Sequence, residues 1–453
     1  GCIYLYFITL KFRLAKFKGN LMYGKEAGAL LENGKIGIGD SVKIKTDRSE
    51  YEGLVMPRIE TGDTNCIILK LSNGYNIGID SRKIKEMRKM ESKKEAPQRA
   101  PTTRDAGRMA ADPKDEIVII GCGGTIASKI EYKTGAVHPA ITSEELVESF
   151  PQLKKKKIRT RMLFSLLSEN LTPQHWIEIA NAVKEEVEKG CKGIVLMHGT
   201  DTMHYTAAAL SYMVKTPVPI VLVGAQRSSD RGSSDNMMNL LSAILAAESD
   251  IAEVTVCMHA TENDDYCHLH KGANVRKMHT SRRDAFKSIN QQPLARMKPD
   301  EEKIEIISDY TKRGDNAFNL DAKLNPNVAL IYVYPGMKKQ QMKDVLQNHD
   351  GAVLIGTGLG HIPSELIDVV KEFSSKKPVA IASQTIYGRL NLNVYETGRN
   401  MMNAGIIGHL SDWTPEAAFV KMMFVLAHSK NAAEAKRMME TNLAGEITER
   451  QEE

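Results

Sequence analysis

Hydrophobic and polar positions change their pattern twice along this chain. Between residues 36 and 88, short runs rich in β-branched residues alternate with turn residues, and Asn73-Gly74 between two of these runs is typical of a tight hairpin. Four or five short strands in this stretch predict a small β-barrel. A unit of this size is marginally stable alone and often serves as a docking module.

Residues 89–114 contain almost nothing that could be buried, because charged residues, proline and small residues dominate them, and they predict a linker. From residue 115 onward, apolar runs of strand length alternate with helical stretches. The runs read EIVIIG, IVLM, PIVLVG and EVTVCMH. The clearest helix covers residues 172–189, with Thr172 as a cap and Gly190 at its end. This alternation predicts a mostly parallel sheet with helices on both faces.

A second strand and helix series begins at residue 327 with NVALIYVYP, continues with AVLIGTG and PVAIAS, and ends with the helix TPEAAFVKMMFVLAHS. Residues 286–326 between the two series are polar and irregular, which predicts an interdomain connection. The expected organisation is an N-terminal extension (1–35), a small β-barrel (36–88), a linker (89–114), a larger α/β domain (115–326) and a smaller C-terminal α/β domain (327–453).

Composition narrows the class of protein. The apolar share of 42%, the charged share of 26% and a net charge of +5 are ordinary for a globular protein and demand no anionic partner. Six scattered cysteines without a CxxC pair favour reduced thiols in the cytoplasm. No apolar run reaches the length of a membrane span, so no membrane contact is expected. Residues 1–21 do not resemble a signal peptide, because their basic residues follow the apolar patch and no small-residue cleavage site comes after it. Met22 is the expected natural start, so these residues are expected to be an upstream extension.

The first candidate for chemistry is the loop GCGGTIAS, residues 121–128, directly after the strand EIVII. Ligands of open α/β sheets bind beyond the carboxyl ends of the strands. Glycines there expose backbone N–H groups to an anion or oxyanion, and Thr125 presents a hydroxyl at the same place. A tight turn with a capping threonine, or a phosphate loop, are the alternatives, although neither GxGxxG nor GxxxxGK[ST] is matched.

The second candidate is His198-Gly199-Thr200-Asp201-Thr202, again just after a strand. A Thr-Asp pair there can bind the charged groups of a ligand, and helix capping is the alternative for Asp201. A third segment, His259 with Cys267, His268 and His270, invites a zinc interpretation, but it lacks the paired spacing of tetrahedral sites, so no metal site is expected.

Together the two threonine loops resemble the GGTIA and HGTDT signatures of the asparaginase family. The segment NVRKMHTS, which begins at Asn274, is similar to that family's lysine-bearing loop and places the family lysine at Lys277. The resemblance covers residues 115–430 and implies an asparaginase-like α/β fold of two domains with parallel sheets, following the small β-barrel. It also implies hydrolysis of a side-chain carboxamide, a homodimeric core, and no cofactor bound by this chain.

The resemblance further implies roles for individual residues. Thr125 matches the usual nucleophile, with Thr200 second, and Thr200, Asp201 and Lys277 match a hydrogen-bonded set that activates the attacker or relays protons. A threonine hydroxyl needs such help because it is almost fully protonated at neutral pH, and a carboxamide is a poor electrophile. Tyr132 resembles the family's flexible-loop tyrosine; an exposed aromatic residue is the alternative.

Ser168 and Glu169 match the family segment that binds the α-amino and α-carboxyl groups of the substrate, although the flanking residues match poorly. Cys122 departs from the family pattern, in which threonine is common. A buried small thiol or a residue that tunes the site are both open at this position.

The N-terminal barrel and the stretches IYGRLNLNVYETGRNMMNAGIIG and LSDWTPEAAFVKMM look like the D subunits of the archaeal glutamyl-tRNA(Gln) amidotransferases. That resemblance implies release of ammonia from glutamine or asparagine. The implied partner is the E subunit of the same glutamyl-tRNA(Gln) amidotransferase. This partner activates Glu-tRNA(Gln) with ATP and Mg and converts it to Gln-tRNA(Gln). It also makes most of the contacts with the tRNA. A free-standing cytoplasmic L-asparaginase, a catalytically dead binding module and a dinucleotide enzyme are the alternatives.

Overall fold

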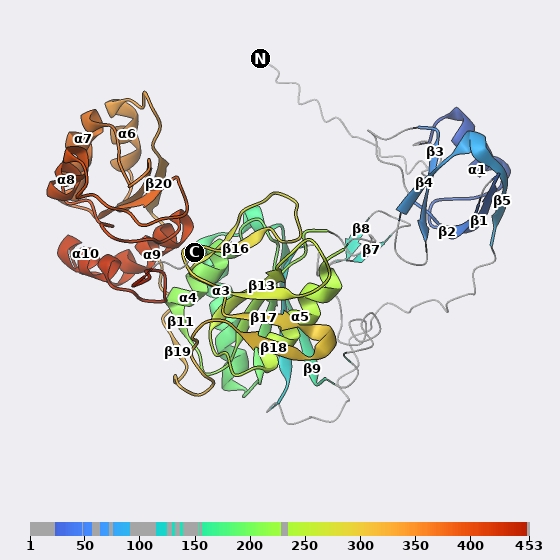
Figure 1. Cartoon of the computed structure of the whole chain (residues 1–453), viewed down its shortest axis with the longest axis horizontal. Coiled ribbons are helices and arrows are strands. Elements are labelled where there is room, and N and C mark those ends of the chain that lie inside the picture. Colours follow the sequence, from blue (N-terminus) through green and yellow to red (C-terminus); the bar gives the residue numbers. More distant parts are fainter. Residues whose placement is uncertain are drawn as a thin grey trace, which may run out of the picture. The chain divides into compact units, whose positions relative to one another are not determined.

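The computed structural model describes residues 23–47, 49–56, 64–71, 76–90, 115–124, 129–131, 136–138, 153, 156–227 and 234–450. These residues fall into two compact units, one built on the N-terminal sheet and one that holds the two α/β sheets (Figure 1). Among the described residues, no helix is both long enough and apolar enough to cross a membrane.

The N-terminal unit is a five-stranded antiparallel sheet in the order β4-β3-β2-β1-β5. Its elements are α1 (Lys25–Asn33), β1 (Ser41–Thr46), β2 (Glu50–Val55), β3 (Cys66–Leu71), β4 (Asn76–Asp80), the 3-10 turn Ser81–Lys83 and β5 (Ile84–Lys89). Alternate residues of β1, Val42 and Ile44, point into the core, as the period of a half-buried strand requires. No strand pairing in the described part of this unit closes the sheet into the expected barrel. The Asn73-Gly74 turn lies outside the described residues.

Helix α1 belongs to this unit, although it lies upstream of residue 36, where the sequence suggested the unit would begin. Ala27 and Leu31 on one face of α1 are fully buried among the strand residues of the same core. Tyr23, just before the helix, donates its hydroxyl to the carbonyl of Met56 at 2.5 Å. The folded unit therefore includes the stretch from Tyr23 onward.

The large sheet of the second unit has eight strands in the order β18-β17-β14-β13-β12-β10-β6-β9. Its strands are β6 (Ile117–Gly123), β9 (Ile158–Leu166), β10 (Gly193–Met197), β12 (Ile220–Val223), β13 (Val254–His259), β14 (Cys267–Lys271), β17 (Ala295–Lys298) and β18 (Lys303–Ile306). The five strands from β9 to β13 are parallel, and the remaining three are antiparallel. The sheet is thus mixed, where a mostly parallel sheet was expected.

Helices cover both faces of this sheet because the strands are apolar on both sides. Val118 and Ile120 of β6 pack in the same core as α3 (Pro173–Glu188) and α4 (Met203–Met213), whereas Ile117 and Ile119 pack in the core of α5 (Asn236–Glu248). Helix α3 confirms the predicted helix, with Thr172 as its N-cap. The Nδ1 atom of His175 accepts from the Thr172 backbone N–H at 3.0 Å.

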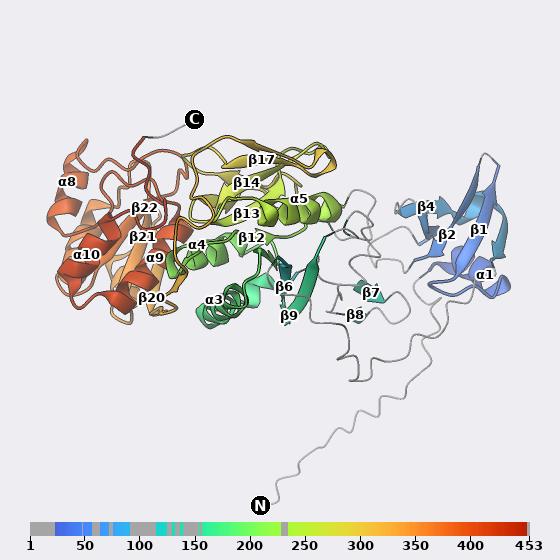
Figure 2. The ribbon, with the colours of Figure 1, turned by 90° about the horizontal axis from the view of Figure 1, so that it is seen from below.

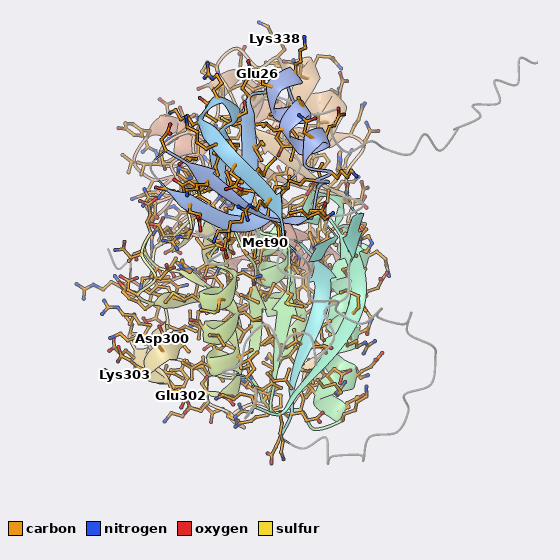
Figure 3. All side chains as sticks on the ribbon, turned by 90° about the vertical axis from the view of Figure 1, so that its right-hand side faces the viewer. Glu26, Met90, Asp300, Glu302, Lys303 and Lys338 are labelled. Atoms are coloured by element: carbon orange, nitrogen blue, oxygen red, sulfur yellow. The ribbon has the colours of Figure 1, made fainter. Side chains whose placement is uncertain are left out.

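The interdomain connection expected over residues 286–326 is wrong in part. This stretch contains β16 (Phe286–Ser288), β17, β18 and β19 (Asn319–Leu320), which pairs with β11 (Val214–Lys215). The strand β18 forms an edge, and Asp300, Glu302 and Lys303 lie exposed at the turn that leads into it (Figure 3). Charged residues protect an edge strand from pairing with another chain, and they also obscure the strand in the sequence.

The small sheet has three parallel strands, β20 (Val328–Tyr332), β21 (Gly351–Gly356) and β22 (Val379–Ser383), as the second series predicts. The helices after β20 are α6 (Lys339–Leu346), α7 (Ile367–Ser374), α8 (Glu396–Asn403), α9 (Pro415–His428) and α10 (Ala432–Glu440), with a 3-10 turn at Ser364–Leu366. Helix α9 lies beside α4 in both views (Figures 1 and 2), and its buried residues share one core with the large sheet.

We predict that Leu31→Ala lowers the stability of the N-terminal unit by about 2–5 kcal/mol, because it leaves a cavity in a closed core. Hydrogen exchange of the β1–β5 amides in the full chain measures this loss. Glu26→Ala, on the exposed face of the same helix, is the matched control and should leave exchange unchanged. Equal exchange in both variants would show that α1 is not part of the fold of this unit.

Candidate active site

The two threonine loops leave the large sheet at the same edge. Strands β6 and β10 are parallel neighbours, and Gly121 pairs with Met197. Because the carboxyl ends of parallel strands meet at one edge, the residues that follow Gly121 and Met197 emerge side by side. The adjacent strand β12 ends at Val223, next to the same loops.

Glycines allow these loops to touch backbone to backbone. A Cβ atom on Gly124, whose φ is +85°, would lie 2.6 Å from the backbone nitrogen of Gly199. A Cβ on Gly199 would lie 2.8 Å from the Cβ of Ser168, and one on Gly224 would lie 2.8 Å from the Cγ2 of Thr200. Real Cβ atoms do not approach other atoms this closely, so side chains at these three positions would push the loops apart.

Lys277 reaches the same edge from a β-hairpin formed by β15 (Val275–Lys277) and β16. Val275 and Phe286, one on each strand, are buried in the main core and fix the hairpin against α4. Lys277 pairs with Phe286 at the end of the ladder. A buried apolar pair therefore anchors the strand that carries the lysine.

The structure brings Thr200, Asp201 and Lys277 together. The Nζ of Lys277 donates to Thr200 Oγ1 at 2.8 Å and to Asp201 Oδ1 at 2.6 Å. The lysine side chain is 9% exposed, whereas that of Asp201 is 69% exposed, so the amine is enclosed while the carboxylate faces solvent. The Asp201 side chain therefore pairs with Lys277. It does not cap the following helix, which was the alternative role for this residue. Helix α4 has Thr202 as its N-cap residue.

Thr202 links this cluster to the third loop, because its hydroxyl donates to the carbonyl of Ser168 at 2.7 Å. Ser168 begins the 3-10 turn Ser168–Asn170 after β9 and is buried against Gly199, while Glu169 is exposed. Ser168 thus lies next to the cluster, and the substrate-binding role of Ser168 and Glu169 remains a prediction. Sequence reasoning did not single out Gly199 and Thr202 as contacts of Ser168, although both stand inside the HGTDT motif.

Buried groups beneath the loops are structural. Burial lowers the pKa of His198 to about 4, so the imidazole is neutral at neutral pH. Its Nε2 lies 2.9 Å from Thr206 Oγ1 and its Nδ1 lies 2.6 Å from the Gly199 carbonyl oxygen. The Cys122 thiol is fully buried, and burial raises its pKa to about 12. Cys122 is therefore a packed small residue and not a reactive thiol.

Thr125 and Tyr132 lie outside the described residues. The chain that leads to Thr125 is described up to Gly124, which contacts Gly199 and so reaches the loop that carries Thr200. The roles assigned to Thr125 and Tyr132 by resemblance remain predictions.

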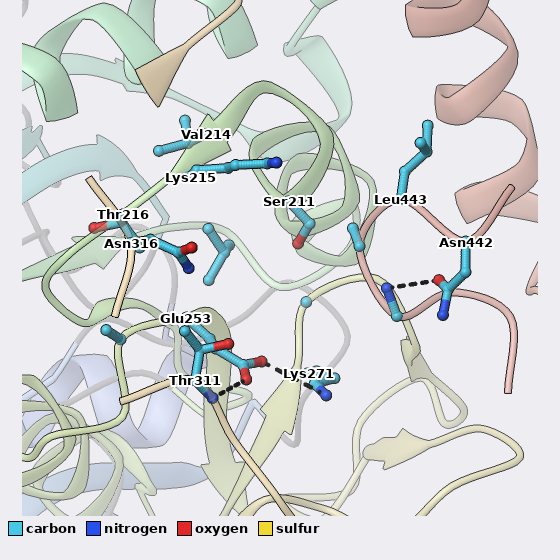
Figure 4. A pocket seen from close by; sticks show the side chains of 15 residues that line it. Ser211, Val214, Lys215, Thr216, Glu253, Lys271, Thr311, Asn316, Asn442 and Leu443 are labelled. Carbon is cyan, nitrogen blue, oxygen red and sulfur yellow. Dashed lines mark hydrogen bonds and ion pairs between the residues drawn. The ribbon is translucent and has the colours of Figure 1, made fainter. Parts of the chain in front are cut away.

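A pocket of about 280 Å³ lies elsewhere in the second unit (Figure 4). The pocket is lined by Lys215, which follows α4, by Val254 at the start of β13, and by Lys271. Lys271 pairs with Thr255, the second residue of β13. It therefore lies at the amino edge of the parallel strands, opposite the Lys277 cluster. Within the described part of the chain, no group of three His, Cys, Asp or Glu side chains is placed to hold a metal ion.

The fold and the site define the class of protein. Residues 116–311 match the family model "Asparaginase, N-terminal", and residues 327–439 match "Glutaminase/Asparaginase C-terminal domain". The thermostable L-asparaginase from Thermococcus kodakarensis is 32% identical, with a TM-score of 0.68 over 74% of this chain and 99% of that one. L-asparaginase I from Vibrio cholerae is 30% identical, with a TM-score of 0.64 over 74% and 99%. The expected asparaginase-like fold is confirmed.

Residues 36–89 match the model "GatD N-terminal domain", in addition to the two asparaginase domains that follow. The D subunit of the glutamyl-tRNA(Gln) amidotransferase of Methanothermobacter thermautotrophicus is 46% identical over 95% of this chain and 98% of its own length. That of Pyrococcus furiosus is 48% identical over 91% and 95%. The chain belongs to the family of glutamyl-tRNA(Gln) amidotransferase D subunits.

We predict that Gly199→Ala lowers the free energy of unfolding by about 1–3 kcal/mol, because the new Cβ would overlap that of Ser168. Denaturant titration of the full chain measures the loss. Adding Ser168→Gly removes the atom that the new methyl group meets, so the double variant should regain part of the stability. If Ser168→Gly lowers the free energy of unfolding by the same amount in Gly199→Ala as in the wild-type chain, the two positions are independent. That result would disprove the contact.

Proposed function

We propose that this chain hydrolyses the side-chain carboxamide of glutamine or asparagine and supplies ammonia for the conversion of Glu-tRNA(Gln) to Gln-tRNA(Gln). The observation that carries the proposal is the enclosed Lys277 amine, 2.8 Å from Thr200 Oγ1 and 2.6 Å from Asp201 Oδ1, beside a glycine loop that leads to Thr125. Similarity to the D subunits over almost the whole chain supports the tRNA-dependent part of the proposal.

In this proposal the Thr125 hydroxyl attacks the carboxamide carbon, and backbone N–H groups of the glycine loop stabilise the oxyanion. The proton of the hydroxyl passes through the Thr200 and Lys277 set to the leaving nitrogen, which departs as ammonia. Water then hydrolyses the acyl ester and releases glutamate or aspartate. The Lys277 amine donates hydrogen bonds to both neighbours. The relay requires its neutral form, because an ammonium group has no lone pair with which to accept the proton of Thr200.

Ser168 and Glu169 bind the substrate's α-amino and α-carboxyl groups in this proposal, and Tyr132 polarises Thr125. The chain itself binds no cofactor. The partner, which is the E subunit, uses ATP and Mg to activate Glu-tRNA(Gln), so that the complete assembly is a ligase, and this partner makes most of the contacts with the tRNA. A homodimeric core and a cytoplasmic location are further parts of the proposal. The alternative is a free-standing L-asparaginase, which the solved asparaginases support for the α/β part alone.

We predict that Lys277→Met lowers the rate of ammonia release by about 10²–10⁴-fold, because the Thr200 hydroxyl loses its partner in proton transfer. A coupled ammonia assay with glutamine and with asparagine measures the rate. Lys215→Met, an exposed lysine at the opposite edge of the sheet, is the control and should keep the wild-type rate. A loss below threefold in Lys277→Met would assign the lysine a structural role only.

We also predict that the tagged chain, expressed in its native cell, co-purifies with a larger ATP-binding chain, and that Glu-tRNA(Gln) with ATP increases ammonia release from glutamine by that complex. Size-exclusion chromatography and the ammonia assay measure both. A homo-oligomer without a partner, with fast asparagine hydrolysis that ignores tRNA, would instead identify a free-standing asparaginase.

A further inference from the structure

The hairpin that carries Lys277 is held from the C-terminal domain at both of its strands. On β15, Arg276 donates its Nε to Glu416 Oε1 at 2.9 Å. After β16, the side-chain amide of Asn290 donates to the Asp412 carbonyl at 2.7 Å, and its oxygen accepts from the Gly388 backbone N–H at 2.9 Å. Residues far along the chain, in the smaller α/β domain, thus contact the hairpin that carries Lys277.

Glu416 faces both segments that form the Lys277 cluster. It stands in the first turn of α9, where a carboxylate is favoured by the helix dipole. Its Oε1 lies 2.9 Å from Arg276, the neighbour of Lys277, and 3.9 Å from Nε2 of His204. His204 is the second residue of α4, three residues after Asp201. One carboxylate therefore meets the lysine hairpin and the helix that follows Thr200 and Asp201.

The charge of Glu416 is matched by Arg276 alone among its described contacts. Burial lowers the pKa of His204 to about 4, so this imidazole is neutral at neutral pH and offers no charge. Glu416 is 6% exposed, and its Oε2 is buried without a hydrogen-bond partner among the described residues. Burying a carboxylate is costly unless it is paired, and removing one partner leaves the other uncompensated. The Arg276 bond is therefore the contact that keeps Glu416 against the hairpin.

We propose that Glu416 is a positioning residue, which acts through Arg276 to hold the Lys277 amine within hydrogen-bond distance of Thr200 and Asp201. The proposal rests on the proposed amidohydrolase function. It assigns the C-terminal domain an indirect part in the chemistry at the edge of the large sheet, through a bond between β15 and α9. Loss of this bond lets the hairpin end shift, and a displacement near 1 Å costs up to about 10²-fold in rate.

The test compares ammonia release by Glu416→Gln, Arg276→Gln and the double variant, each made in the full chain with any partner that co-purifies. Each single variant should lower kcat about tenfold and change KM less than about twofold, because substrate binding does not use this bond. The double variant should be no slower than either single variant, because both residues act through one contact. Arg276 is partly exposed, so Arg276→Gln keeps the test valid if Glu416→Gln does not fold.

Glu446→Gln is the control, because Glu446 forms a buried ion pair with Lys421 of the same helix, away from the hairpin. It should lower the melting temperature and leave kcat unchanged. A wild-type kcat in Glu416→Gln, a similar loss of kcat in Glu446→Gln, or losses that multiply in the double variant would each overturn the proposal. A wild-type chain that releases no ammonia from either amide would instead reject the proposed function itself.

Discussion

Backbone contact without intervening side chains is the constraint on which the site depends. Gly124 against Gly199, and Gly199 against Ser168, bring the ends of β6, β10 and β9 to within van der Waals contact at one edge of the sheet. The register of the parallel strands places these loops side by side, and the missing Cβ atoms close the remaining distance. The enclosed Lys277 amine then joins two of the loop residues into one hydrogen-bonded cluster.

The sequence predicted those elements whose pattern is local. Helix 172–189 and the strands of both parallel series were found where an amphipathic stripe or a continuous apolar run marked them. The strands β17 and β18 were missed because an edge ladder tolerates charged residues such as Arg296 and Lys303, which dilute the apolar pattern. Helix α1 was left outside the N-terminal unit because its short buried face gives no sign of what it packs against.

Much of the site was predicted from motifs. The contacts that hold the Lys277 hairpin from the smaller α/β domain were not. Thr200, Asp201 and Lys277 were named from resemblance, and the structure brings them together across 76 positions of sequence. The Arg276–Glu416 bond joins residues 140 positions apart, and no local pattern distinguishes Glu416 from an ordinary residue in the first turn of a helix. The smaller α/β domain is thereby a structural support for the larger one.

We propose that the Thr125 hydroxyl is the nucleophile that attacks the carboxamide carbon. The test mixes the chain with glutamine or asparagine and stops the reaction rapidly with acid. Intact-mass and peptide analysis then show whether an acyl group is attached to the chain, and on which peptide. We expect an acyl adduct on the peptide that contains Thr125, and this adduct should be absent in Thr125→Ala. Ammonia release without any adduct on this peptide, or with an adduct only on Thr200, would contradict it.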